Sequence, residues 1–392
     1  MAKNQKLVVY SVILVLLASI ILTVNPMPVT AVLFPTAEGI VTDRFTGKPL
    51  PNVHVRLSEN GNPKGSTYTD SNGYYSIART GIPIPNSVYV ILKFSKSGYR
   101  TKSFGVLLYK RQITTVNCEL NPYKMAILVD SGSTNYIWDA KYDVMDMYTF
   151  LENKGFICAI YGGGSYLYND DGVNGRYVAG YSTKANVRSA IQDLSSFCVS
   201  GDKVVLYFTG HGASDETQGW LYEEKYTFYA ENPTNNVRSY LKLWHGSATD
   251  YYYDYELRID LEGFNNNIQI TIFTDVCGTG GFLPDISHAQ NAEYILFLAA
   301  CFGNGHGWTS TSYKNGLLTY WVLESFNVKS TWEDAFSYAI NSNGYLQDKQ
   351  GIYNSVTHPI DGTLLDEYRL YYAWTLDHPE KFDGNTHVKY YL

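Results

Sequence analysis

Charged residues are scarce in this sequence, and neither sign forms a block. Of 392 residues only 17% are charged, with 30 Lys and Arg against 37 Asp and Glu, and the formal net charge is −7. Proteins that bind nucleic acids usually present a concentrated basic face. We therefore expect no nucleic-acid partner, and the sequence offers no acidic tail as an interaction segment either.

Cysteine is also sparse, and its spacing excludes the common metal and redox motifs. The sequence contains five cysteines and no Cys-x-x-Cys pair, which removes the usual basis for a zinc or redox site. Neither His245 nor His288 has the partner spacing of a metal site, so we expect no metal and no other cofactor. Because five is odd, one thiol stays free or pairs between chains in an oxidising compartment. The other four either form two disulfides or are small buried residues.

An apolar segment at the N-terminus is the clearest targeting signal. Two lysines precede an unbroken apolar run over residues 7–24, and Pro26 stops any helix. A small-residue site ends at Ala31, as in a signal peptide, but the run is nearly long enough to span a bilayer. Residues 1–31 are therefore either a cleaved signal peptide or a signal anchor. In both cases the protein is secreted or anchored to the outer face of the cytoplasmic membrane, and the membrane is a partner only if the segment is retained.

Residues 32–122 have the pattern of a small all-β domain. Val53–Leu57 alternates apolar and polar residues with the period of a half-buried strand, and glycines and prolines punctuate the stretches between such runs. About seven short strands separated by regular turns predict a β-sandwich.

This segment resembles the carboxypeptidase regulatory-like domain, which is a transthyretin-like sandwich. The resemblance rests on Val41–Asp43, Thr46–Val53 and Thr69–Tyr75. Such a domain implies no chemistry of its own, so it is expected to act as a spacer or a substrate-docking module.

The pattern changes at residue 123, and residues 123–392 read as an α/β domain. Continuous apolar runs of about five residues are typical of strands buried on both faces, and amphipathic segments alternate with them. This alternation predicts a mostly parallel sheet flanked by helices. The predicted strands are Met125–Val129, Ile157–Tyr161, Val204–Phe208, Ile268–Phe273 and Tyr294–Ala300, and the predicted helices are Ile137–Lys154, Asn186–Phe197, Leu317–Phe326 and Trp332–Ile340.

A histidine and a cysteine follow two of these strands. In open α/β sheets, functional residues gather at the carboxyl ends of the strands. His211 and Cys277 each stand in a Gly-rich turn directly after such a strand. A thiolate can attack a carbonyl while a nearby imidazole handles the proton of the leaving amine, and the backbone N–H groups of Gly212 and Cys277 can bind the oxyanion. The two residues are therefore predicted to form a catalytic dyad.

The two motifs together resemble the caspase, metacaspase and legumain group of cysteine peptidases. Leu206–Ala213 is similar to the strand and His-Gly motif of that group, and Asp275–Gly281 is similar to its nucleophile turn, with Thr279 where serine is usual. The late helix at Gly316–Glu324 is similar as well. The resemblance implies a caspase-like fold, His211 and Cys277 as the dyad, and a protein or peptide substrate.

The same resemblance assigns specificity to two carboxylates. Asp275 precedes the nucleophile by two residues, and Asp143 matches a second acidic position on the first helix. Two carboxylates in the pocket for the residue before the scissile bond (P1) would favour Lys or Arg. Legumain-like cleavage after Asn is the rival, and the alternative for Asp143 is a solvated helix face.

Several readings stay open. His306 follows the fifth strand and could reach the rim of the cleft. The Tyr-rich segment from Ser214 to Gly263 either contributes to the substrate groove or forms a hairpin that covers the sheet edge, and its Glu223-Glu224 pair is expected in a solvated loop. An inactive caspase-like scaffold at the cell surface is the alternative to a peptidase, and an adhesion protein that relies on the sandwich is a third possibility.

Overall fold

The computed structural model divides the chain into two compact units. The first comprises the chain up to Thr42 together with residues 49–96 and 101–120, and the second comprises residues 43–48, 97–100 and the chain from Asn121 onward. The structure describes residues 34–82, 85–132, 139–163, 168–169, 172–173, 175–214, 238–245, 248–301, 307–310, 312–353, 380–384, 390 and 392.

The first unit is the predicted all-β sandwich. One sheet has the order β4 (Tyr74–Ala78), β1 (Thr36–Asp43) and β7 (Ile113–Thr115), with β8 (Cys118–Leu120) also paired to β1. The other has the order β3 (Asn62–Tyr68), β2 (His54–Glu59), β5 (Ser87–Ser95) and β6 (Lys102–Tyr109). Alternate residues of β5 are buried, as expected of a strand with one face on a core. Tyr75 and Phe94 meet edge to face across the two sheets, with ring centroids 5.3 Å apart.

The second unit is built on a seven-stranded sheet, which confirms the predicted α/β class. Each pair of neighbours is parallel except the last, in which β20 runs antiparallel to β17. The sheet order is β11 (Val178–Gly180), β10 (Ile157–Tyr161), β9 (Lys124–Ser131), β12 (Lys203–Gly210), β16 (Gln269–Val276), β17 (Ile295–Ala299) and β20 (Glu380–Asp383). The chain moves outward from β9 first to β10 and then, on the other side, to β12. Such a switch in strand order leaves a crevice at the carboxyl ends of the strands.

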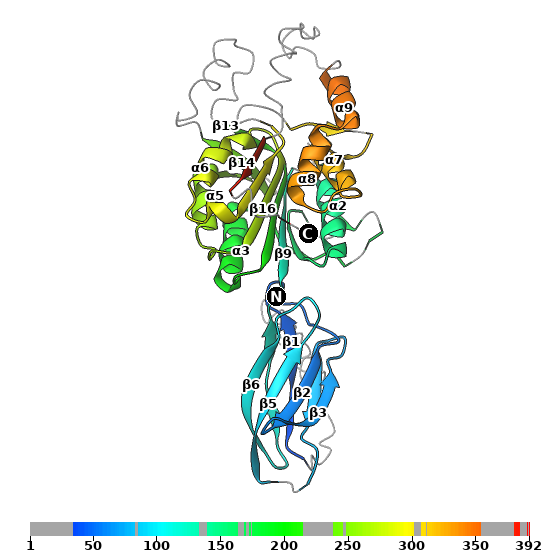
Figure 1. Cartoon of the computed structure of the whole chain (residues 1–392), viewed down its shortest axis with the longest axis vertical. Helices are drawn as coiled ribbons and strands as arrows, with labels where there is room; N and C mark the ends of the chain where they lie inside the picture. The colour runs from blue at the N-terminus through cyan, green and yellow to red at the C-terminus, as the bar shows by residue number, and fades with distance from the viewer. Residues whose placement is uncertain are drawn as a thin grey trace, which may run out of the picture. The chain divides into compact units, whose positions relative to one another are not determined.

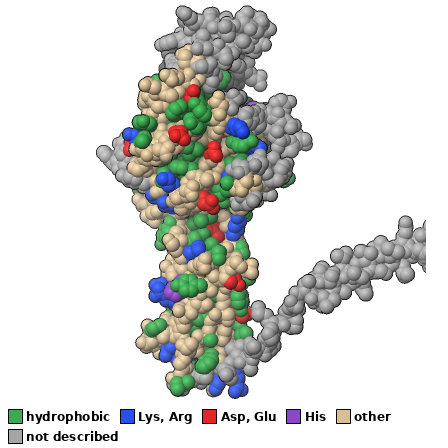
Figure 2. Space-filling view, turned by 90° about the vertical axis from the view of Figure 1, so that its right-hand side faces the viewer, with side chains coloured by type: hydrophobic (Ala, Val, Ile, Leu, Met, Phe, Trp, Pro, Cys, Tyr) green, Lys and Arg blue, Asp and Glu red, His purple; other side chains and the backbone are tan. Residues whose placement is uncertain are grey.

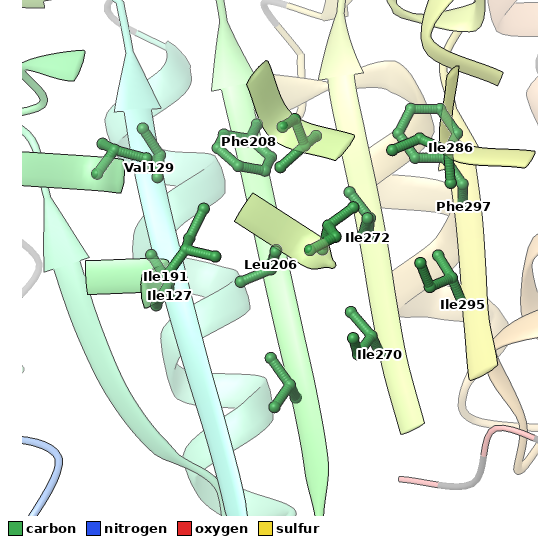
Figure 3. Close-up of a cluster of buried hydrophobic side chains, with 14 of the residues drawn as sticks. Ile127, Val129, Ile191, Leu206, Phe208, Ile270, Ile272, Ile286, Ile295 and Phe297 are labelled. Carbon is green, nitrogen blue, oxygen red and sulfur yellow. The ribbon is translucent and has the colours of Figure 1, made fainter. Parts of the chain in front are cut away.

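Helices cover both faces of this sheet (Figure 1). One face carries α2 (Asp139–Asn153), α7 (Leu317–Ser325) and α8 (Trp332–Ile340), and the other carries α3 (Lys184–Phe197), α5 (Asp254–Leu261) and α6 (Leu283–Ser287). The strands supply apolar side chains to both faces, which explains their unbroken apolar runs. Figure 3 shows Ile127, Leu206, Ile272 and Phe297 side by side in the core beneath α3, α5 and α6.

The structure differs from the sequence-based expectation in a few elements. Strands β12 and β16 continue to Gly210 and Val276, so Asp275 lies within a strand rather than after it. Helix α5, helix α9 (Asn343–Tyr353) and strand β20 were not predicted.

The described strands of the Tyr-rich segment belong to a small antiparallel sheet. Strand β14 (Ser239–His245) lies between β13 (Gly212–Ser214) and β15 (Ala248–Tyr253). Strands β14 and β15 form a hairpin, which was one of the two alternatives for this segment, and Leu241 and Tyr252 pack into the same core as α3 and α5.

Surface charges are dispersed. On the face drawn in Figure 2, the basic and acidic side chains of the described residues are interspersed among apolar and neutral ones.

Within the described part of the chain, no helix is long and apolar enough to cross a bilayer. The apolar run at residues 7–24, which prompted the expectation of a signal or anchor, lies outside that part.

A buried carboxylate fastens α5 to its neighbours. Asp260 accepts hydrogen bonds from Arg188 Nε at 2.8 Å and Nη2 at 3.0 Å, from Gln192 Nε2 at 2.8 Å and from Tyr252 Oη at 2.8 Å. A charge removed from water in this way is tolerated only when its hydrogen bonds are satisfied. These four bonds join α3, α5 and β15 around a single side chain.

We expect Asp260→Ala to lower the free energy of unfolding by about 2–4 kcal/mol, because it leaves Arg188, Gln192 and Tyr252 without the buried carboxylate that they share. Denaturation in urea measures the change. Asp193→Ala is the matched control, since this aspartate is exposed on α3 and should change stability by less than about 0.5 kcal/mol. Equal losses in the two variants would contradict the role given to Asp260.

Candidate functional site

The register of three neighbouring strands places His211 and Cys277 together. Gly210, the last residue of β12, pairs with Ser131 of β9 on one side and with Val276 of β16 on the other. His211 and Cys277 are the next residues of their strands, so they leave the sheet side by side. The predicted placement of both residues at one edge is therefore confirmed, whereas their catalytic role stays a prediction.

A left-handed glycine turns the chain at His211. Gly210 has a φ of 115°, a conformation that residues with a side chain rarely adopt. A Cβ at this position would lie 2.4 Å from the Gly132 nitrogen and 2.6 Å from the Ser131 carbonyl carbon. Ser131 Oγ lies 2.7 Å from the carbonyl oxygen of Thr209 and 3.2 Å from that of His211. The Ser131 hydroxyl thus contacts carbonyl groups on both sides of Gly210, and these contacts stabilise the turn that carries His211.

The imidazole of His211 is partly buried beside a cation. Burial, followed by the positive charge of Lys242, lowers the pKa of His211 from its ordinary value of 6.5. The main-chain N–H of Lys242 donates to the His211 carbonyl at 2.9 Å, which ties this turn to β14. The ring is therefore predominantly neutral at pH 7 and able to accept a proton.

The amide of Gly212 points away from the hairpin. Gly212 pairs with Leu241, and the adjacent pair, His211 and Lys242, is joined by a main-chain hydrogen bond. Hydrogen-bonded and non-hydrogen-bonded pairs alternate in antiparallel ladders, so β14 does not use the Gly212 N–H. A Cβ on Gly212 would lie 2.7 Å from the Cys277 carbonyl oxygen. This close approach requires glycine and brings Gly212 next to the turn that carries Cys277.

A tight turn presents the thiol of Cys277. Gly278 has a φ of 73° and begins the short 3₁₀ helix Thr279–Phe282. Its N–H donates to the Cys301 sulfur at 3.2 Å. Thr279, where the caspase and legumain group usually has serine, is buried and its hydroxyl donates to the Val276 carbonyl at 2.9 Å. The threonine therefore stabilises the turn. Cys301 supports the same turn, and no pattern in the sequence pointed to this role.

The five cysteines are all free thiols, so neither of the two disulfides left open by the sequence is present. Cys277 alone is partly exposed, and the other four are buried. Burial raises the pKa of Cys118 and of Cys198 to about 12, which leaves these thiols protonated and unreactive at neutral pH. The Cys277 thiol lies 3.7 Å from the Gly307 carbonyl oxygen.

The two predicted specificity carboxylates converge on Gly316. A Cβ on this glycine would lie 2.2 Å from Asp275 Oδ2 and 3.1 Å from Asp143 Oδ2. Asp143 is only 1% exposed, which excludes the solvated helix face. Its carboxylate accepts from the Gly316 N–H and the Thr209 hydroxyl, both at 2.7 Å. Asp275 Oδ2 accepts from the N–H and the hydroxyl of Thr319, both at 2.8 Å.

Burial weakens the acidity of both carboxyls. It raises the pKa of Asp275 to about 6, although the hydrogen bonds from Thr319 act in the opposite direction. Burial and then the charge of Asp275 raise the pKa of Asp143 well above its usual range. Asp275 consequently loses its negative charge as the pH falls through about 6.

A third buried carboxyl lies in the same row of the sheet. Asp130 and Asp275 both pair with Thr209, one on each side of β12. Asp130 accepts from the Gly132 N–H at 2.8 Å and from the Tyr168 hydroxyl at 2.9 Å. Burial raises its pKa to about 6. The sequence placed Asp130 at the end of a strand but gave no indication of this partnership with Tyr168.

The remaining candidates do not join this site within the described residues. His288 is exposed, with Nδ1 2.5 Å from the Pro284 carbonyl oxygen. His306 and the Glu223-Glu224 pair lie outside the described residues. His245 is the last residue of β14.

Comparison with known proteins identifies the first unit. Residues 36–121 match the family model of the carboxypeptidase regulatory-like domain, which confirms the resemblance drawn from the sequence. No curated protein matches the chain at a significant level.

Solved structures give distant likenesses. Protein GSU0716 from Geobacter sulfurreducens is 16% identical, with a TM-score of 0.38, and the match covers 67% of this chain and 93% of that one. The 5-hydroxyisourate hydrolase of Klebsiella pneumoniae is 17% identical, with a TM-score of 0.19, over 22% of this chain and 90% of that one. With TM-scores this low, neither likeness supports a conclusion about function.

We expect the pKa of His211 to lie below 6.5 and to rise when Lys242 is replaced by Met, because the positive charge that disfavours the imidazolium is removed. Titration of the His211 ring by NMR in the Cys277→Ala protein measures it without interference from the thiol. Lys154→Met is the matched control, since Lys154 lies near the opposite end of β9, where Lys124 Nζ contacts its carbonyl. The environment described for His211 is wrong if Lys242→Met leaves its pKa unchanged.

Proposed function

We propose that this protein is a caspase-like cysteine endopeptidase that acts outside the cytoplasm. The observation that carries the proposal is the adjacent exit of His211 and Cys277 from paired strands, at the point where Gly210 pairs with Val276. Both the partial exposure of Cys277 and the neutral character of the His211 ring fit this role. The N-terminal apolar run supports the location.

The proposed reaction proceeds through a thioester. His211 accepts the thiol proton, and the sulfur of Cys277 attacks the carbonyl carbon of the substrate peptide. The N–H groups of Gly212 and Cys277 stabilise the oxyanion that forms. The His211 imidazolium then gives its proton to the leaving amine, the C–N bond breaks, and an acyl-enzyme remains. Water, deprotonated by His211, hydrolyses the thioester, releases the carboxylic acid and restores the thiol.

Peptide substrates are proposed to be cut after Arg or Lys. The support for this specificity is electrostatic, since two buried carboxylates lie close to the turn that carries Cys277. Asp275 precedes Cys277 by two residues, and Asp143 lies beside Asp275 next to Gly316. A cationic side chain that approached this cluster would form charge-assisted hydrogen bonds. Cleavage after Asn is the competing specificity, since an amide can also donate to these oxygens.

We expect an electrophilic peptide probe with Arg at P1 to modify Cys277 in the full protein, and Cys277→Ala to abolish both the labelling and the cleavage of fluorogenic peptides. Peptide mapping by mass spectrometry locates the modified residue. Cys118→Ala is the matched control, because its buried thiol lies in the first unit, and it should retain full activity. Absence of labelling in the folded wild-type protein would favour the alternative of an inactive scaffold.

We expect Asp275→Asn to lower kcat/KM for a P1-Arg peptide by about ten- to a hundredfold, since a hydrogen bond to a charged group contributes about 1.5–3 kcal/mol. In the wild-type protein the preference for Arg over Asn should weaken as the pH falls through about 6, where Asp275 becomes protonated. A series of P1-Arg, P1-Asn and P1-Asp peptides measures both effects.

Asp193→Asn, a change on the exposed surface of α3, is the control for this series and should leave the Arg preference unchanged. A wild-type protein that cleaves after Asn and ignores Arg would rule out the basic specificity while leaving the dyad in place.

A further inference from the structure

The small β13–β14–β15 sheet has two unlike faces. Side chains alternate along a strand, and Leu241, Leu243 and Tyr252 point into the core of the second unit. The neighbouring residues of β14 and β15 therefore occupy the opposite face. This face carries three tyrosines, which we call the tyrosine face: Tyr240, Tyr251 and Tyr253.

The rings of the tyrosine face hold one another in place. Tyr240 meets Tyr251 edge to face with centroids 5.0 Å apart, and it meets Tyr253 in the same way at 5.7 Å. Lys184 Nζ lies 6.0 Å from the centroid of Tyr253. Tyr251 remains 42% exposed. The face is thus an ordered aromatic surface with one ring open to a ligand, and aromatic rings favour edge-to-face and offset contacts with other rings.

This surface begins at His211. The main-chain hydrogen bond from Lys242 to His211 shows that His211 lies opposite Lys242, one residue before the first pair of β13 and β14. On its other side, Lys242 pairs with Tyr251 of β15. His211, Lys242 and Tyr251 therefore form one row across the three strands. Neighbouring strands are about 4.8 Å apart, so the backbones of His211 and Tyr251 are separated by about 10 Å. The positive charge of Lys242, which lowers the pKa of His211, acts along this row.

The tyrosine face and the carboxylate pair belong to opposite sides of the main sheet. Asp143 and Asp275 lie on the side covered by α2 and α7, where Thr319 and Gly316 bind them. The β14–β15 hairpin packs on the side of α3 and α5. A peptide that crosses the carboxyl edge of the strands between these surfaces meets the dyad in the middle. Because His211 delivers the proton to the leaving amine, the histidine side is the side of the leaving chain.

We propose that the tyrosine face binds the part of a peptide substrate that follows the scissile bond, and that it selects an aromatic side chain there. This inference rests on the proposed peptidase function. An extended chain rises about 3.4 Å per residue, so the second or third residue after the bond reaches Tyr251. The face therefore sets a second specificity, distinct from the charge-based selection at P1.

The test compares two kinds of substrate that share the preferred P1 residue. Internally quenched peptides carry Phe or Ala at the second or third position after the bond, and a coumarin amide has no residues after it. Wild-type protein is expected to cleave the better Phe peptide about two- to tenfold faster in kcat/KM than its Ala counterpart, as an aromatic contact allows. Tyr251→Ala should remove this preference, Tyr251→Phe should keep it, and all three proteins should cleave the coumarin amide equally well.

Tyr338→Ala is the matched control, since this tyrosine is similarly exposed on α8, and it should retain the preference. Cleavage of the coumarin amide by wild-type protein without any preference for Phe would overturn the inference but not the peptidase. Failure to cleave either kind of substrate would instead overturn the proposed function. An equal loss on both substrates in Tyr251→Ala would assign the residue to stability and would also overturn the inference.

Discussion

The in-register parallel pairing of β9, β12 and β16 is the constraint on which the rest of the site depends. It aligns Ser131, Gly210 and Val276 in one row, and the next residues of β12 and β16 are His211 and Cys277. Successive side chains of a strand point to opposite faces, so a slip of one residue would move Asp275 and Thr209 to the wrong side of the sheet. The apolar residues buried on both faces make such a slip costly, and the hydrophobic core thereby fixes the distance between the imidazole and the thiol turn.

The same register explains why three carboxyls can be buried together. Asp130 and Asp275 flank Thr209 on one face, and α2 adds Asp143 from above that face. A buried charge without hydrogen bonds would cost several kcal/mol (about 2–7 even for a neutral polar group). Here threonine hydroxyls, backbone amides and the Tyr168 hydroxyl supply the bonds. A cluster that is expensive to bury and contributes nothing to apolar packing is typical of a functional site.

Much of this arrangement could be predicted from the sequence, because long apolar runs are a strong signal. The five inner strands and the helices α2, α3, α7 and α8 follow from such runs and from amphipathic periodicity. Helix α5 escaped prediction because its stability depends on tertiary contacts, above all the bonds that Asp260 makes with Arg188 and Tyr252. Helix α9 contains Gly344, a weak helix former, which is required because a Cβ there would lie 2.0 Å from Trp321.

The residues of the candidate site likewise divide into those that the sequence predicted and those that it did not. His211 and Cys277 were found by inspecting strand ends, which is a local operation, and Asp143 was found by resemblance. Ser131 and Cys301 were not found, since their roles depend on which main-chain atoms they meet after the sheet has formed. Ser131 reaches the carbonyl of His211 across a strand boundary, and Cys301 receives the Gly278 N–H from a turn that is distant in sequence. A sequence pattern can predict which face of a strand or helix a residue occupies. To predict its hydrogen-bond partners on other strands, one must also know how the strands are aligned in the sheet.

The surfaces on the two sides of the main sheet give the proposed enzyme two independent forms of recognition. As proposed, the carboxylate pair would select its substrate through charge, so the strength of that selection would depend on pH and on the protonation of Asp143 and Asp275. The tyrosine face acts through apolar contact, which has no such dependence. Since the dyad lies at the edge between them, a bound peptide would have to satisfy both surfaces before its carbonyl reached Cys277. At acidic pH the charge-based selection fades first, and the aromatic contact after the scissile bond would then account for a larger share of the remaining specificity.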